Sequence, residues 1–149
     1  MRIGEYCNQD VITMRGDESV KAVAELMRQY HVGDVVLVEE RNGQSIPKGI
    51  ITDRDIVVEV VAKGVDAISL TAQDIVTRSL LTVHEDDNLF NCLALMRTKG
   101  VRRLPVVNDN KGLVGIITLD DITAVLSGML FNVVGIVDRQ QQIETKQRA

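Results

Sequence analysis

The residues of this chain best suited to chemistry are a threonine and an aspartate that recur in two copies of one motif. The sequence Gly-Ile-Ile-Thr-x-x-Asp occupies residues 49–55 and again residues 115–121. A threonine followed three residues later by an acid is typical of a capping box at the start of a helix. A helix N-terminus also attracts phosphate, and an ionised carboxylate can accept two hydrogen bonds from a ribose diol. The motif therefore predicts a helix cap, a nucleotide site, or both.

The two motifs belong to an internal repeat that organises the chain. A shift of 69 residues aligns residues 11–38 with residues 80–107, and the shift becomes 66 after a loop that differs in length. Within the motif region, six of the eight positions in residues 49–56 are identical in residues 115–122. Self-similarity of this kind indicates a duplicated structural unit.

Each copy shows the same series of hydrophobic patterns. A short apolar run is followed by a segment whose apolar residues fall at i, i+3, i+4 and i+7, the period of an amphipathic helix. Two apolar runs around a polar turn come next and suggest a hairpin, and a second helical segment follows. Ser19 and Asn88 are suitable N-caps, and Gly100 suits a helix end. We expect strands at residues 11–14, 35–38 and 49–52 in the first copy, and at 80–83, 104–107 and 113–118 in the second.

These patterns predict an α+β fold built from two repeated β-α-β-β-α units. We expect the first unit at residues 1–66, the second at 67–131, and a helical extension with a polar tail at 132–149. A unit of about 60 residues buries only about 60% of the surface of its unfolded chain and is marginally stable alone. The units should therefore pack together with pseudo-two-fold symmetry, which creates two equivalent clefts at the joint.

At this level of detail the chain resembles the tandem CBS-domain pair, or Bateman module, of the stand-alone bacterial type. The resemblance rests on the duplication, the element order, the sequence GVRRLPVV at residues 100–107 and both GIITxxD motifs. It implies that the clefts bind adenosyl effectors, namely AMP, ADP, ATP, S-adenosylmethionine or NAD, without a catalytic cofactor. By position, it assigns Asp55 and Asp121 to the ribose, and Thr52 and Thr118 to the ribose or a phosphate.

The resemblance also extends to the base and the phosphates. The resemblance places residues around the first short strand of each unit near the purine base. It places apolar residues of the central strands beside the purine ring. Arginines that differ between the copies are candidate phosphate clamps, with solvated surface arginines as the alternative. The clefts should therefore be unequal, although the sequence does not show which one Arg102 and Arg103 face. The residues concerned are Ile12, Thr13, Leu81 and Thr82 for the base, Val35 and Leu104 for the ring, and Arg54, Arg102 and Arg103 for phosphate.

Composition excludes several other classes of function. The formal charge is −4, and only four of the 149 residues are aromatic, which disfavours nucleic-acid binding and association with anionic membranes. Two cysteines and two histidines form neither a disulfide scaffold nor a metal-ligand pattern. We find no catalytic constellation and no export signal, so we expect a cytoplasmic protein that is not an enzyme and holds no metal.

The apolar segment at residues 122–137 needs a partner. It is shorter than the ~20 apolar residues that span a bilayer, and polar residues interrupt it. We predict that it lies in a homodimer interface, with an ordinary core helix as the alternative. The function predicted overall is a regulatory module that senses an adenosyl ligand and acts on a protein that the sequence does not identify. The competing hypothesis is a structural dimerisation module without a ligand.

Overall fold

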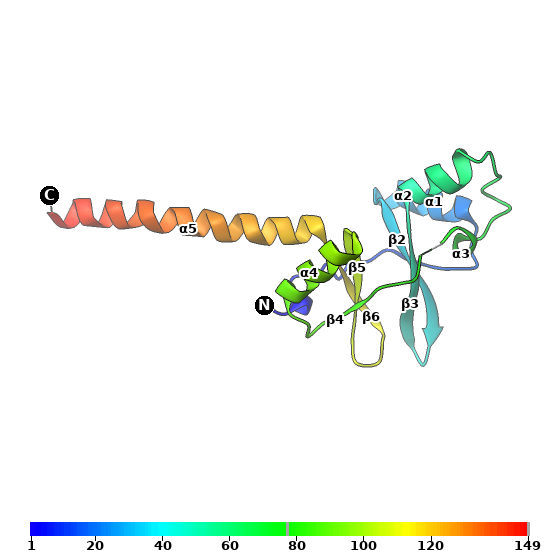
Figure 1. Ribbon diagram of the computed structural model, residues 1–149, viewed down its shortest axis with the longest axis horizontal. Coiled ribbons are helices and arrows are strands. Elements are labelled where there is room, and N and C mark those ends of the chain that lie inside the picture. The colour runs from blue at the N-terminus through cyan, green and yellow to red at the C-terminus, as the bar shows by residue number, and fades with distance from the viewer. Residues whose placement is uncertain (77, 149) are drawn as a thin grey trace.

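Two three-stranded sheets, each with helices on its outer side, form the body of the molecule, and one long helix leaves it (Figure 1). The structure is a computed structural model that describes residues 1–76 and 78–148. The first repeat contains β1 (Thr13–Arg15), α1 (Val20–Tyr30), β2 (Asp34–Arg41), β3 (Gln44–Thr52), α2 (Asp53–Ile56) and the π-helical segment η2 (Val57–Val61). The second contains β4 (Val83–His84), α4 (Leu89–Lys99), β5 (Arg103–Val107), β6 (Leu113–Thr118) and α5 (Leu119–Arg148). Two short helices, η1 (Ile3–Glu5) and α3 (Ala72–Ile75), precede the repeats.

The sheets have the same topology, which confirms the predicted α+β duplication. In each, the central strand pairs in parallel with the first strand and antiparallel with the third. Each central strand also changes register at an equivalent point, Leu37/Val38 in β2 and Val106/Val107 in β5. The predicted caps are confirmed as well, because Ser19 accepts from the Ala22 N–H and Asn88 accepts from the Phe90 N–H.

The side chains of β2 alternate between two cores. Val35 and Leu37 are buried in the core of the first repeat, beneath α1. Val36 and Val38 point the other way and pack with Ile116 of the second repeat. This period of two is what a strand requires when both of its faces are buried. The apolar layer between the sheets holds the two repeats together.

The repeats also exchange their leading segments. Ile3 of η1 is fully buried in the core of the second repeat, where its N–H donates to the Asp87 carbonyl at 3.0 Å. Ala72 of α3, the equivalent residue 69 positions later, is fully buried in the core of the first repeat, where its N–H donates to the Glu18 carbonyl at 2.8 Å. Each core is therefore completed by a segment that precedes the other repeat.

The structure corrects one sequence prediction in this region and refines another. The first strands, expected at residues 11–14 and 80–83, are the edge strands β1 and β4 and begin two or three residues later. The second helical segment of the first repeat is a short α-helix followed by a π-helical turn, and its apolar residues Val57 and Val61 are 56 % and 68 % exposed. The cause is the wider π-helical turn of η2, which rotates them away from the core and leaves Val60 buried.

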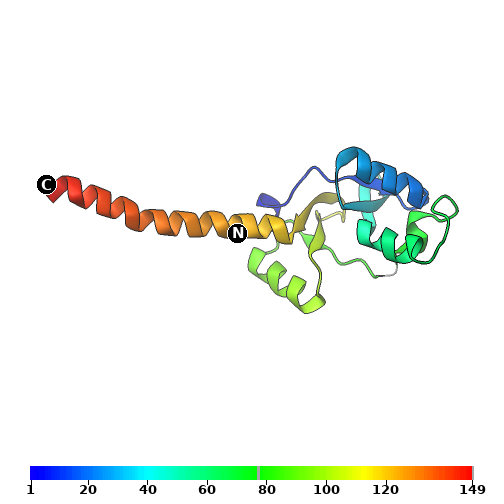
Figure 2. The ribbon, with the colours of Figure 1, turned by 90° about the horizontal axis from the view of Figure 1, so that it is seen from above.

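The last helix differs most from expectation. Within Leu119–Arg148 only Ile122 is buried, so the alternative of an ordinary core helix is wrong. Figure 1 and Figure 2 both show α5 extending away from the two sheets as one continuous helix. By length and composition alone, this helix is also long and apolar enough to cross a membrane.

Candidate ligand-binding cleft between the repeats

Both copies of the motif form capping boxes. In the first copy the Thr52 N–H donates to Asp55 Oδ2 at 2.8 Å, and the Asp55 N–H donates to Thr52 Oγ1 at 3.1 Å. In the second copy the equivalent bonds join Thr118 and Asp121 at 3.0 and 3.1 Å. The capping interpretation is thus confirmed. Because these bonds to the carboxylates use Oδ2, Oδ1 of each aspartate remains able to accept from a ligand.

A cleft of about 600 Å³ lies in front of the first motif, at the joint between the repeats. Thr52 and Asp55 line it from the first repeat, and Leu80, Leu81 and Leu104 line it from the second. Ligand sites for small molecules have volumes of about 300–1,000 Å³ and combine apolar walls with a few polar groups. The cleft therefore has the size and the wall chemistry for a nucleotide.

Four arginines line this cleft. Arg54, Arg102 and Arg103, the three candidates from the sequence, all lie on its wall, so the structure settles which motif Arg102 and Arg103 face. The fourth is Arg78, which the sequence analysis missed. One signal could have found it, because Arg78 is the only lysine or arginine between Lys63 and Arg97 and precedes the apolar run that forms the wall.

One of these arginines is already paired. Arg103 Nη1 lies 3.3 Å from Asp34 Oδ2, and their side chains are 31 % and 26 % exposed. The two residues occupy equivalent positions, so the ion pair joins the repeats at the pseudo-two-fold axis. Burial raises the pKa of the Asp34 carboxyl, Arg103 opposes that shift, and the charge of Asp53 adds to it. Arg54, Arg78 and Arg102 are exposed and can reach a ligand.

The remaining predicted residues are divided between the two sides of the joint. Leu81 lines the cleft, whereas the next residue, Thr82, is exposed and does not line it. Leu104 lines the cleft although it is almost fully buried, whereas Val35 is fully buried in the core of the first repeat. Six of the predicted residues therefore lie outside this cleft. Two are Thr82 and Val35, and the other four occupy the positions equivalent to Leu81, Thr82, Thr52 and Asp55, namely Ile12, Thr13, Thr118 and Asp121.

Comparison with known proteins agrees with this architecture. The family model for the CBS domain matches residues 3–62 and again residues 72–128. The chain belongs to the CBS domain family. Its two repeats form a tandem CBS pair, and the residues between the two matches include part of the connection that leads into α3.

Solved CBS pairs share the fold over most of this chain. The CBS domain pair of protein MJ0100, in complex with 5′-methylthioadenosine and S-adenosyl-L-methionine, aligns with a TM-score of 0.74 at 26% identity, over 87% of this chain and 98% of that one. CBS domain protein PAE2072 from Pyrobaculum aerophilum, complexed with AMP, aligns with a TM-score of 0.72 at 27% identity, over 81% and 89%. Both of these CBS pairs were solved with adenosyl compounds.

A relative in sequence is the uncharacterized protein MK0525 of Methanopyrus kandleri. It is 42% identical over 123 residues, which are 83% of this chain. This chain spans 61% of the length of that relative. The likeness therefore covers the CBS pair and leaves more than a third of the relative unmatched.

Proposed function

We propose that this CBS pair is a regulatory module that binds an adenine nucleotide in the cleft lined by Thr52 and Asp55. The observation that carries the proposal is the coincidence, in one cleft, of a carboxylate with a spare acceptor oxygen and a group of arginines. Asp55 Oδ1 would accept from the ribose hydroxyls, and the arginines would hold the phosphate. The apolar residues Leu80 and Leu81 would pack against the base.

The charges in the cleft favour a phosphate-bearing ligand over other adenosyl compounds. Four arginines line the cleft together with three carboxylates, those of Asp53, Asp55 and Glu59. Guanidinium groups form bidentate hydrogen bonds with phosphate oxygens. S-adenosylmethionine carries a cationic sulfonium where a nucleotide carries phosphate, so the arginines would repel it. The phosphate-bearing compounds AMP, ADP, ATP and NAD are therefore the preferred ligands.

The position of the cleft suggests how binding acts on the rest of the protein. Its walls come from both repeats, so a bound nucleotide would favour the arrangement of the repeats that it contacts best. We place this module in the cytoplasm as a homodimer, formed through the repeat helices and α5, that signals to a partner protein without catalysing a reaction. Exposed Val57 and Val61 on η2 and the exposed apolar face of α5 support that association.

Thermal unfolding with a panel of ligands tests the proposal. Protein that has been shown by absorbance to carry no nucleotide is heated with AMP, ADP, ATP, adenosine and S-adenosylmethionine. A ligand at 100 times its Kd adds about 2.7 kcal/mol, which raises Tm by about 5–10 °C in a chain of this size. We expect the rise with nucleotides and little with adenosine or S-adenosylmethionine. A flat panel would favour the ligand-free dimerisation module instead.

A further inference from the structure

We propose that the α5 helices of two copies form a parallel two-stranded coiled coil. The inference rests on the homodimer proposed above and is independent of the ligand. It specifies which residues meet and in which direction the helices run.

The exposed apolar face of helix α5 requires a binding partner. The helix extends away from the body of the molecule (Figure 2), and after Val125 its apolar side chains are exposed. Monomeric proteins rarely expose contiguous apolar surface on this scale. The exposed apolar residues of the helix after Val125 are Leu126, Met129, Leu130, Phe131, Val133, Val134, Ile136, Val137 and Ile143.

The spacing of five of these nine residues matches a coiled-coil seam. Starting at Leu126, residues separated alternately by three and four positions follow one face of α5 to its end. This is the a/d pattern of a heptad repeat, with Met, Ile and Ile at d and Leu, Val, Gln and Gln at a. Polar residues at a positions fix the register and the number of strands, at some loss of stability. The seam consists of Leu126, Met129, Val133, Ile136, Gln140, Ile143 and Gln147, whereas Ile122 is buried in the core of the second repeat.

The charges beside the seam favour the parallel arrangement. Arg139 occupies a g position and Glu144 the e position five residues later. In a parallel coiled coil, a g residue faces the e residue of the following heptad in the other helix, so Arg139 of each copy meets Glu144 of the other. In an antiparallel coiled coil g faces g and e faces e, and the pair is lost.

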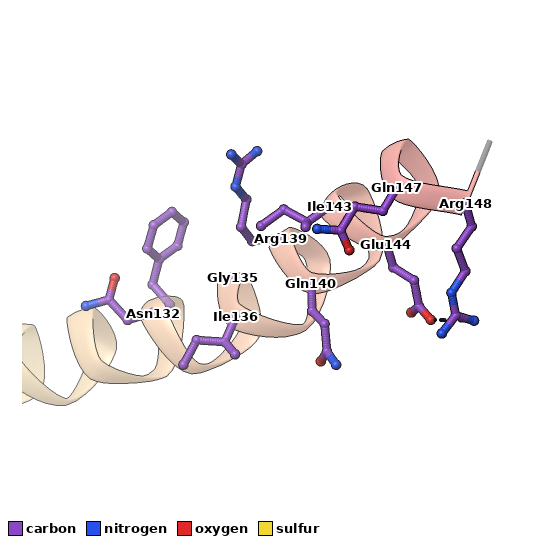
Figure 3. Close-up of a pocket in the computed structure, with 10 residues that line it drawn as sticks. Asn132, Gly135, Ile136, Arg139, Gln140, Ile143, Glu144, Gln147 and Arg148 are labelled. Carbon is purple, nitrogen blue, oxygen red and sulfur yellow. Dashed lines mark ion pairs between the residues drawn. The ribbon is translucent and has the colours of Figure 1, made fainter.

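In the single chain these two residues have only weak local partners. Glu144 Oε1 lies 2.9 Å from Arg148 Nη1, one turn along the exposed helix (Figure 3), and Arg139 Nη1 lies 3.4 Å from Gln142 Oε1. Exposed pairs at i, i+4 contribute only about 0.3–0.5 kcal/mol. Neither contact would prevent Arg139 and Glu144 from pairing with a second copy.

A second copy fits the whole helix better than a lipid bilayer does. The seam continues through the polar part of α5, where Gln140, Ile143 and Gln147 keep the spacing. A membrane span has no reason to maintain a heptad pattern beyond its apolar stretch. Ile122 and Val125 also pack in the second repeat, so the apolar stretch left free is residues 126–137, which is shorter than the ~20 residues that span a bilayer. The pattern therefore indicates a protein partner of the same length and register.

Disulfide crosslinking of the full chain tests the register and the direction. In a parallel coiled coil each a residue faces its own copy, so Gln140→Cys should form a crosslinked dimer on oxidation. Gln141→Cys, the adjacent b position, is the matched control and should stay monomeric on a non-reducing gel. Cys7 and Cys92 are present in both variants, so wild-type protein sets the background. Crosslinking that is equal at both positions, or absent at 140, overturns the parallel coiled coil.

The mass in solution separates failure of this inference from failure of the homodimer. Val133 lies in the seam and Val134 beside it, and they are 59 % and 56 % exposed. Because the repeat helices also contribute to the proposed dimer, we expect Val133→Asp to raise the dissociation constant measured by light scattering on dilution, and Val134→Asp to leave it unchanged. A dissociation constant equal to that of wild type in both variants keeps the homodimer but overturns the coiled coil, and a monomeric wild type overturns both. Binding of wild type to phosphatidylcholine vesicles that both variants weaken equally would assign the face to a membrane.

Reversing the charges gives an independent test of direction. Arg139→Glu and Glu144→Arg should each weaken the dimer, and the double variant should restore its dissociation constant to within about twofold of wild type. A double variant that is no better than either single variant overturns the parallel pairing.

Discussion

The two sides of the joint share a scaffold but differ in charge. Both motifs cap a helix with the same two reciprocal bonds, at distances that agree within 0.2 Å, and in the second motif Thr118 Oγ1 also donates to Asp121 Oδ2 at 2.9 Å. Around the first motif stand four arginines, and the equivalent residues around the second motif are neutral or acidic. The four pairs are Arg54 and Asp120, Arg78 and Gln9, Arg102 and Gly33, and Arg103 and Asp34.

This difference shows which part of the motif serves the fold and which part serves the ligand. The threonine and the aspartate are needed on both sides, because each helix start has unsatisfied N–H groups that a cap must satisfy. The arginines are not needed for the cap and occur on one side only. We therefore expect one side of the joint to bind anionic ligands and the other to act as scaffold. Substitutions at equivalent positions of the two repeats test this difference.

The largest effect should come from the two aspartates. Asn keeps a side-chain acceptor for the cap but removes the charge, so Asp55→Asn should weaken nucleotide binding about 10- to 100-fold. Hydrogen bonds to charged groups contribute about 1.5–3 kcal/mol, which corresponds to that loss. Asp121→Asn, the matched control, should change affinity less than about twofold in isothermal titration. Equal losses in the two variants would show that the arginines do not decide which side binds.

The glycines that begin the two motifs, Gly49 and Gly115, should also differ, in this case in how much space the fold leaves for a side chain. A Cβ on Gly115 would lie 2.7 Å from the Asn8 carbonyl oxygen and 2.8 Å from Cys7 Sγ, in the segment exchanged from the N-terminus. Among the residues that the structure describes, the closest contact of a Cβ on Gly49 would be the Val76 side chain, at 3.1 Å. Overpacking costs about 1–3 kcal/mol. We expect Gly115→Ala to lower the free energy of unfolding by that amount and Gly49→Ala by less, in urea denaturation; the reverse order would contradict the exchange.

Local signals in the sequence were sufficient for the scaffold. The helical period, the caps at Ser19 and Asn88 and the repeated motif each depend on residues close together in the chain, and the structure confirms them. The π-helical turn at Val57–Val61 was missed, because apolar residues there suit either helix geometry and only packing against the core selects one.

Features made by distant residues could not be predicted. The exchange of η1 and α3 depends on how the repeats meet, and no pattern within residues 1–10 shows that Ile3 joins the second core. The ion pair between Asp34 and Arg103 joins residues 69 positions apart that align with each other. Aligning the two repeats shows that these residues occupy the same position, but it does not show that their side chains are in contact. Arg78 was overlooked because it precedes the repeat elements.

A smaller effect is expected at Arg78 and its counterpart. Arg78→Gln installs the residue that stands at the equivalent position of the first repeat, and should weaken ATP binding about two- to fivefold, since exposed ionic contacts contribute about 0.2–1 kcal/mol. The loss should shrink in 0.5 M salt, where exposed charges are screened. Gln9→Arg makes the opposite change beside the other motif and should leave affinity for the first cleft unaltered. A loss independent of salt would argue against a phosphate contact.

The smallest effect concerns the ion pair on the axis and depends on pH. Burial raises the pKa of Asp34 in the folded protein, and the Arg103 charge only partly offsets this. Between the ordinary pKa and the raised one, the folded state binds more protons than the unfolded state, so this group's contribution to stability falls as pH rises through that window. Asp34→Asn has no carboxyl to titrate, so this loss of stability does not occur in the variant. Its Tm should therefore be higher than that of wild type at pH 7, and the difference should disappear near pH 4.

The gain at neutral pH should be a few degrees at most. Partly exposed ion pairs contribute about 0–1 kcal/mol, and 1 kcal/mol corresponds to about 2–4 °C in a chain of this size. Arg103→Gln, which removes the positive charge that opposes the effect of burial on Asp34, should instead lower Tm at pH 7 more than at pH 4. If Asp34→Asn lowers Tm at pH 7, the attraction of Arg103 outweighs burial, and the joint between the repeats is held by charge as well as by its apolar layer.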